Sequence, residues 1–334
     1  MNQGYLPGTA PARRALAAHW WLATLVVALL LAGAMAYLET KGLGRDRPLE
    51  QMFSYNVCSY AHLLLIGSSL LYVAHLWWRA VAVGLWASCL AALGALGLFV
   101  ALALHASESV ALHGDAHVTL TSLSEVMALF SGFTVLIYLA MEWVYRSRAA
   151  GAFVMPVVVA AVLFQAWLSA QEHTAGAGEL PLLLSYEVRV HVLTNLVAYG
   201  AFTVAAALGA MYLLRQHAER HSPALGLGMR ALLDPQRTER LMHSAVTLGF
   251  PLFSAAILLG MVAARNGWGR YWAWDPKETW SFVVWSVYAV YFCLHYLLRW
   301  RGRRMALWVI AGFGLALSGF FGVNLLFARL HVFG

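Results

Sequence analysis

Apolar residues dominate long stretches of this chain, and polar residues gather in short segments between them. Each apolar stretch is about 20 residues long, the length of an α-helix that crosses the hydrocarbon core of a bilayer. Hydrocarbon offers backbone groups no hydrogen-bond partners, and a β-barrel would show short alternating segments instead. The pattern therefore predicts an all-α, polytopic membrane helix bundle with about nine transmembrane helices. The predicted spans are residues 17–38, 56–78, 81–104, 125–145, 152–170, 191–214, 244–264, 279–298 and 305–328.

Composition and charge support a membrane protein and predict its orientation. Of the 334 residues, 61% are hydrophobic and 11% are charged, whereas a soluble domain carries roughly 25% charged residues. With the N-terminus cytoplasmic and the C-terminus outside, 14 of the 22 basic residues lie in cytoplasmic segments, as the positive-inside rule requires. The net charge of +7 then reflects topology, and no nucleic-acid partner is needed to explain it. The first apolar run is expected to remain a helix, although a cleaved signal peptide stays open as an alternative.

The cysteines argue against thiol chemistry within this chain. Cys58, Cys89 and Cys293 all fall in predicted spans, and the sequence has neither C-x-x-C nor C-x-x-C-H. A dithiol redox enzyme or a covalently haem-bearing cytochrome would carry such a motif. Any thiol chemistry is therefore expected to belong to a partner.

A tryptophan-rich segment follows the seventh predicted span and is expected on the outer side. Trp268, Trp272 and Trp274 stand in W-x-x-x-W-x-W spacing with glycines among them. An aromatic belt at the membrane interface is the plainer alternative, but a belt places aromatic residues at helix ends. The spacing instead favours a shaped apolar platform for a large planar ligand.

The residues after the tryptophans predict how this segment ends. Asp275, Pro276 and Glu278 form the signature of a helix start, with an acidic N-cap, proline at N1 and glutamate at N3. The cap would set the exit angle of the loop and so hold the platform rigid.

The segment also resembles a known family. It reads Trp268-Gly-Arg-Tyr-Trp-Ala-Trp-Asp-Pro-Lys-Glu-Thr-Trp280. This form of the WWD motif resembles CcsA, also called ResC, the haem-binding subunit of the System II cytochrome c synthase, more than the related CcmC and CcmF subunits. The resemblance is strong over residues 240–334 and weaker over 120–215. Residues 1–120 are thus expected to form N-terminal helices with little family signal, and 121–334 the haem-handling core with its external loop 265–280.

The resemblance implies a function in cytochrome c biogenesis. It implies that haem b (iron protoporphyrin IX) is bound at the outer face of the bacterial cytoplasmic (inner) membrane and attached to the C-x-x-C-H segment of apocytochrome c. The implied partners are a CcsB/ResB-like membrane subunit and a thiol-reducing thioredoxin-like protein. Three alternatives stay open: a haem carrier without ligase activity, a membrane b-type cytochrome in electron transfer, and a solute transporter or channel.

Two histidines are expected at the level of the tryptophan loop. His191 lies at the outer start of the sixth predicted span and His331 just beyond the outer end of the last. Two imidazoles across a porphyrin are a sufficient set of axial ligands, and the resemblance implies the same pair. With Asp275, which shapes the loop, they form the expected catalytic set. The side chains expected to contact the haem are Trp268, Arg270, Tyr271, Trp272, Trp274 and Trp280.

A second haem site is expected near the cytoplasmic side. His295 lies 19 residues beyond Pro276, or about 29 Å down a helix, and the resemblance implies that a transmembrane histidine here holds haem on its way outward. His75 is expected at nearly the same depth, which makes a His75–His295 pair one hypothesis. The other is that the partner subunit supplies the second histidine. His243 departs from the family pattern, and its inner position favours a polar interfacial role, whereas His62 is expected to be a bundle-facing polar residue or a relay.

Overall fold

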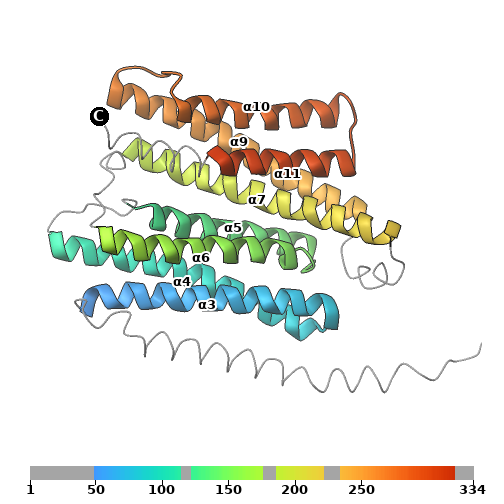
Figure 1. Cartoon of the computed structure of the whole chain (residues 1–334), viewed down its shortest axis with the longest axis horizontal. Coiled ribbons are helices and arrows are strands. Elements are labelled where there is room, and N and C mark those ends of the chain that lie inside the picture. Colours follow the sequence, from blue (N-terminus) through green and yellow to red (C-terminus); the bar gives the residue numbers. More distant parts are fainter. Residues whose placement is uncertain (1–48, 114–121, 176–185, 222–233, 320–334) are drawn as a thin grey trace, which may run out of the picture.

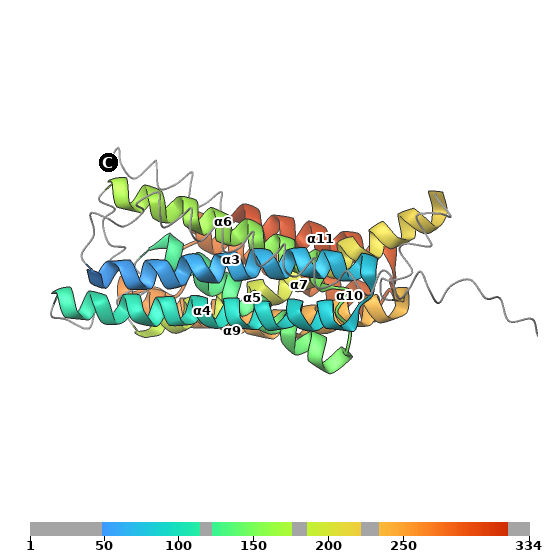
Figure 2. The ribbon, with the colours of Figure 1, turned by 90° about the horizontal axis from the view of Figure 1, so that it is seen from below.

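The computed structural model describes residues 49–113, 122–175, 186–221 and 234–319, and every regular element within these ranges is a helix. Figure 1 shows these helices lying side by side with their long axes in one direction, which the perpendicular view in Figure 2 supports. The predicted all-α class is confirmed. The helices are α3 (Leu49–Trp78), α4 (Val81–His113), α5 (Leu123–Tyr145), α6 (Gly151–Ala175), α7 (Tyr186–His221), α9 (Pro235–Trp268), α10 (Pro276–Tyr296) and α11 (Arg303–Ser318).

Six of these helices, from α3 to α9, are long and apolar enough to cross a membrane, so the chain is a helical membrane bundle. α10 has 21 residues, and the structure describes α11 only as far as residue 319. The predicted span at residues 17–38 and the end of the last one lie outside the described residues. The count of nine spans and the orientation of the termini therefore remain predictions.

Short connections make α10 antiparallel to both of its sequence neighbours, α9 and α11 (Figure 1). Residues 269–275 join α9 to α10, and the end of the bundle that carries them is called the tryptophan-loop end below. The first turns of α3, α5, α7 and α10 lie at that end, and their last turns lie at the opposite end (Figure 1).

The helix α7 occupies the centre of the bundle, where it packs against α5, α6, α9 and α11. Its Ala198, Ala201 and Ala205 are fully buried, and such small residues let neighbouring helices approach closely. Phe202 of α7 also stacks on Tyr288 of α10, with 3.7 Å between ring centroids and 7° between planes. The helix therefore connects the α3–α6 half of the bundle to the α9–α11 half.

One buried carboxylate joins α3, α4 and α5 near the end opposite the tryptophan loop. The hydroxyls of Tyr72 and Tyr138 donate to Glu142 Oε2 at 2.6 and 2.7 Å. Ser88 Oγ donates to Glu142 Oε1 at 2.5 Å, and Arg148 Nε donates to the same oxygen at 3.1 Å. Because four donors surround it, this buried acid is explained by helix packing and needs no catalytic role.

We predict that Glu142→Ala destabilises the bundle by about 3 kcal/mol, because it removes the buried carboxylate that pairs with the half-buried Arg148 and accepts from three hydroxyls. Thermal unfolding of the detergent-solubilised chain measures the effect. The matched control is Glu219→Ala, whose carboxylate pairs with Arg215 one turn away at 2.8 Å. Such a pair contributes about 0.5 kcal/mol or less. Equal shifts for the two variants would contradict the assigned role of Glu142.

Candidate functional site

The loop that carries the tryptophans is held at both ends. Gly269 is the C-cap of helix α9. Its φ of 75° is left-handed, and its N–H donates to the Arg265 carbonyl at 3.0 Å. Helix α10 begins with Asp275 as N-cap, and Asp275 Oδ1 accepts the Glu278 N–H at 2.8 Å. The predicted acidic cap with proline at N1 is confirmed.

The glutamate at N3 reaches further back than a capping box requires. Glu278 Oε2 accepts the N–H of Ala273 at 2.5 Å, two residues before the cap residue. Thr279 Oγ1 donates to the Trp274 carbonyl at 3.2 Å. These bonds flank Trp274, which has a left-handed φ of 57°, a conformation that is uncommon for a bulky residue and costly without support. The first turn of α10 thus holds the loop in its shape.

An apolar hollow lies beneath this loop, between α9 and α10. Its volume is about 440 Å³. Trp272 and Trp274 form one wall and meet edge to face, with 5.6 Å between ring centroids and 82° between planes. The lining residues are Ser254, Ile257, Leu258, Met261, Trp272, Trp274, Phe282 and Trp285.

One polar atom of this wall is without a partner. Trp285 Nε1 donates to Ser254 Oγ at 2.9 Å, whereas Trp272 Nε1 is buried and bonds to no described residue. A buried indole N–H normally has an acceptor. The hollow itself is lined by apolar surface and suits the apolar ring of a large planar ligand such as haem.

Several expected contact residues lie elsewhere on the loop. Arg270 and Tyr271 are exposed, and the cation beside the Tyr271 ring is Arg265, whose guanidinium carbon lies 5.8 Å from the ring centroid. Trp268 ends α9, and its side chain lies outside the described residues. The structure thus brings Trp272 and Trp274 together at the hollow and leaves Arg270 and Tyr271 exposed on the loop.

Trp280 has a packing role that the sequence did not reveal. Its Nε1 donates to the Leu315 carbonyl of α11 at 2.9 Å, and its ring lies so close to Gly319 that a side chain there would overlap it. Trp280 therefore joins α10 to α11 and does not line the hollow.

His191 lies in the second turn of α7 and faces α9. Its Nδ1 lies 2.6 Å from the carbonyl oxygen of Ala256. Since a carbonyl only accepts, Nδ1 carries the proton and the lone pair remains on Nε2. Histidines that bind metals are commonly oriented by such a bond. The expected partner, His331, lies outside the described residues, so their pairing remains a prediction.

A glycine makes room for this imidazole. A Cβ built on Gly260 would lie 2.9 Å from both Cε1 and Nδ1 of His191. Ala256 and Gly260 lie on a different face of α9 from Ile257 and Leu258, by the 3.6-residue period. His191 and the hollow thus flank the same end of α9 without sharing a wall.

The structure separates His75 from His295. His75, on α3, donates from Nδ1 to the Ala80 carbonyl at 3.0 Å. His295, on α10, stacks on His243 of α9, with 4.0 Å between ring centroids and 9° between planes. Because α3 and α10 lie at opposite edges of the bundle (Figure 1), the two histidines do not form the hypothesised joint site. The sequence places both His243 and His295 towards the cytoplasmic side of the membrane. Their contact follows only from the packing of α9 on α10.

Two other cavities are present in the described part of the chain. One, of about 270 Å³, lies among α3–α6 towards the tryptophan-loop end. There His62 Nε2 lies 3.0 Å from Gln165 Oε1, so His62 faces the bundle.

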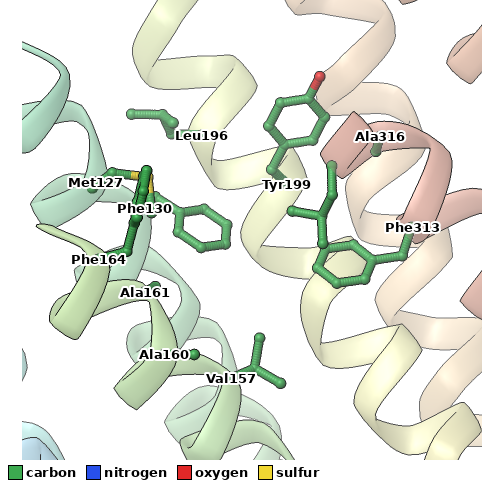
Figure 3. A pocket seen from close by; sticks show the side chains of 11 residues that line it. Met127, Phe130, Val157, Ala160, Ala161, Phe164, Leu196, Tyr199, Phe313 and Ala316 are labelled. Atoms are coloured by element: carbon green, nitrogen blue, oxygen red, sulfur yellow. The ribbon is translucent and has the colours of Figure 1, made fainter. Parts of the chain in front are cut away.

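The other cavity, of about 160 Å³, lies among α5, α6, α7 and α11 and is apolar. Figure 3 shows its aromatic and aliphatic side chains, with the Tyr199 hydroxyl pointing away from the rest. Apart from Met127 and Tyr199, the apolar cavity is lined by hydrocarbon side chains alone.

We predict that Gly260→Ala destabilises the chain by about 1–3 kcal/mol, because the new methyl group overlaps the His191 ring. In a His191→Ala background, the same change should be neutral or stabilising by about 0.5–1 kcal/mol, since alanine is the better helix former. Unfolding of the four proteins forms a double-mutant cycle. Equal costs in the two backgrounds would show that the imidazole does not occupy this space.

Comparisons with known proteins agree with this architecture. Residues 120–331 match the family model described as "Cytochrome C assembly protein". A relative from Parasynechococcus marenigrum, named cytochrome c biogenesis protein CcsA, is 30% identical over 279 residues, which cover 76% of this chain and 92% of the relative. A protein of the same name from Picosynechococcus is 27% identical over 268 residues, covering 64% and 79% of the two chains. The chain therefore belongs to the cytochrome c assembly protein family.

Proposed function

We propose that this chain acts in cytochrome c biogenesis by binding haem b at the tryptophan-loop end. The observation that supports this most is the apolar hollow beneath Trp272 and Trp274, in a chain whose relatives are named for cytochrome c biogenesis. An apolar hollow with a few directed polar groups is the usual form of a cofactor site.

The proposed axial ligands are His191 and His331. Because the Nδ1–H of His191 donates to the Ala256 carbonyl, the lone pair on Nε2 would be the one that binds iron. Two imidazole ligands give a low-spin haem iron with no open position. The histidine of the apocytochrome C-x-x-C-H segment would displace one of these two ligands. This ligand exchange would commit the apocytochrome to thioether formation.

The proposed reaction joins haem to apocytochrome c together with a CcsB/ResB-like membrane subunit. Haem supplies two vinyl groups, and each apocytochrome S–H adds across one C=C bond to form one C–S and one C–H bond. This addition consumes no oxidant, and a thioredoxin-like protein would keep the thiols reduced. The contribution of the chain is to position the reactants. His191 and His331 would hold the iron, and the tryptophan loop would border the haem at the same end of α9. Asp275 and Glu278 hold that loop in its shape.

At the opposite end of the bundle, His295 is the proposed ligand of a loading site from which haem moves outward. His295 lies in the last turn of α10, and an ionisable residue within a predicted membrane span is a candidate for a functional site. Since His75 lies on the far side of the bundle, we propose that the partner subunit supplies the second axial ligand. In this arrangement the tryptophan loop faces the periplasm and the protein resides in the bacterial inner membrane.

The test is to purify the full chain with its partner subunit and record oxidised and reduced visible spectra with a pyridine haemochrome assay. We expect b-type haem with a low-spin bis-His spectrum in the wild type. His191→Ala and His331→Ala should each lose haem, or regain the low-spin spectrum when imidazole is added. His105→Ala, at the same end of the bundle, is the matched control. Haem that is absent, or that does not respond to either substitution, would overturn the proposal.

A second prediction separates the structural role of Asp275 from a role of its charge. Asp275→Asn keeps an N-cap acceptor and should retain haem and apocytochrome maturation, whereas Asp275→Ala loses about 1 kcal/mol of helix stability and should lower both. The readouts are haem content and the yield of mature cytochrome c. An asparagine variant as defective as the alanine variant would show that the carboxylate charge is required.

A further inference from the structure

A stacked pair of histidines stands at the end of the bundle opposite the tryptophan loop. The imidazole of His243, from α9, lies face to face with that of His295, from α10, at 4.0 Å and 9°. Tyr296 meets the His295 ring edge-on, with 5.0 Å between centroids and 84° between planes. His295 is therefore enclosed by aromatic rings on one face and one edge.

The ring of His243 is held by hydrogen bonds at both nitrogens. Its Nδ1 lies 3.1 Å from the Tyr291 hydroxyl and its Nε2 lies 3.0 Å from the Tyr296 hydroxyl. A neutral imidazole has one donor and one acceptor nitrogen, so these two tyrosines satisfy both. Tyr291 is itself fully buried, so the packing that surrounds it also restrains the His243 ring.

The ring of His295, unlike that of His243, is not held by a hydrogen bond at Nδ1. Its Nδ1 is buried and bonds to no described residue. Arg301, the nearby cation, donates to the backbone carbonyl of His295 at 2.7 Å and so orients the backbone. A histidine that binds a metal normally donates its second ring N–H to an acceptor that sets the ring orientation. Within the described residues, the aromatic contacts with His243 and its tyrosines stand in place of that hydrogen bond.

We propose that His243 is a positioning residue for His295: by stacking on it, His243 holds the imidazole in the orientation that binds haem iron at this end of the bundle. This inference rests on the proposed role of His295 as a loading ligand. His243 is not itself the second axial ligand, because its two nitrogens are engaged with tyrosines and its ring lies against the face of His295. Axial ligands would instead point their nitrogens at one another across the iron.

The experiment compares His243→Leu, which removes the aromatic face, with His243→Phe, which retains one. Each full-length variant is purified with its partner subunit, and its visible and low-spin ferric EPR spectra are recorded. The haem signal in these spectra that is lost in His295→Ala defines the loading site. In His243→Leu, we expect haem to bind there about 10- to 100-fold more weakly, as for other residues that orient a ligand. His243→Phe should stay close to the wild type.

Two controls separate positioning from damage to the fold. The haem component that depends on His191, at the other end of the bundle, should remain in His243→Leu. His75→Leu, the same substitution at the same end of the bundle but on α3, should leave the His295-dependent component unchanged. If His75→Leu weakens that component as much as His243→Leu, the effect is not specific and the proposal fails.

The remaining outcomes also decide the question. An unchanged loading site in His243→Leu would overturn the positioning role while leaving His295 as a ligand. A phenylalanine variant as weak as the leucine variant would show that a nitrogen of His243 matters, which contradicts stacking as the cause. If His295→Ala binds haem as the wild type does, the loading site itself is absent, and this failure is distinct from the other two.

Discussion

The packing register of α9 against α10 controls both proposed haem positions in this chain. The two helices are joined by a short loop whose shape is set by Gly269, Asp275 and Glu278. Because antiparallel helices joined by so short a loop have little freedom to slide, the loop also determines which residues face each other far from it. At one end this places Trp272 and Trp274 over an apolar hollow. At the other it places His243 on the face of His295.

Within hydrocarbon, polar side chains are costly unless they are paired, and this chain treats them in two ways. Glu142 has four donors around it, and the indole of Trp285 has Ser254 as its acceptor. By contrast, Trp272 Nε1 and His295 Nδ1 are buried without a partner among the described residues. Asn195, Glu239 and Tyr288 also have a buried polar atom without a partner among the described residues, so such an atom does not by itself mark a site. The paired groups hold the helices together.

The roles proposed for α9 and α10 follow from this arrangement. A face of α9 supports His191 through the Ala256 carbonyl and the space above Gly260, while another face of the same helix forms the hollow. Helix α10 carries the tryptophan platform at its start and His295 in its last turn. In the proposed function, the pair α9 and α10 thus connects the loading site to the tryptophan-loop end, and α7 packs between α9 and the α3–α6 half of the bundle.

Helix positions and the start of α10 were predictable from the sequence, because hydrophobic period, span length and cap residues are local properties. The acidic cap at Asp275 and the spans from α3 to α9 lie where the pattern predicts them. Tertiary structure alone decided the neighbours: Trp280 packs on α11, His75 lies far from His295, and His243 stacks on His295. It also decided which nitrogen of His191 carries the proton, since the carbonyl to which Nδ1–H donates belongs to another helix. The physical reason is that apolar periodicity tells which face of a helix is buried, whereas contacts between faces depend on helix packing across residues distant in sequence.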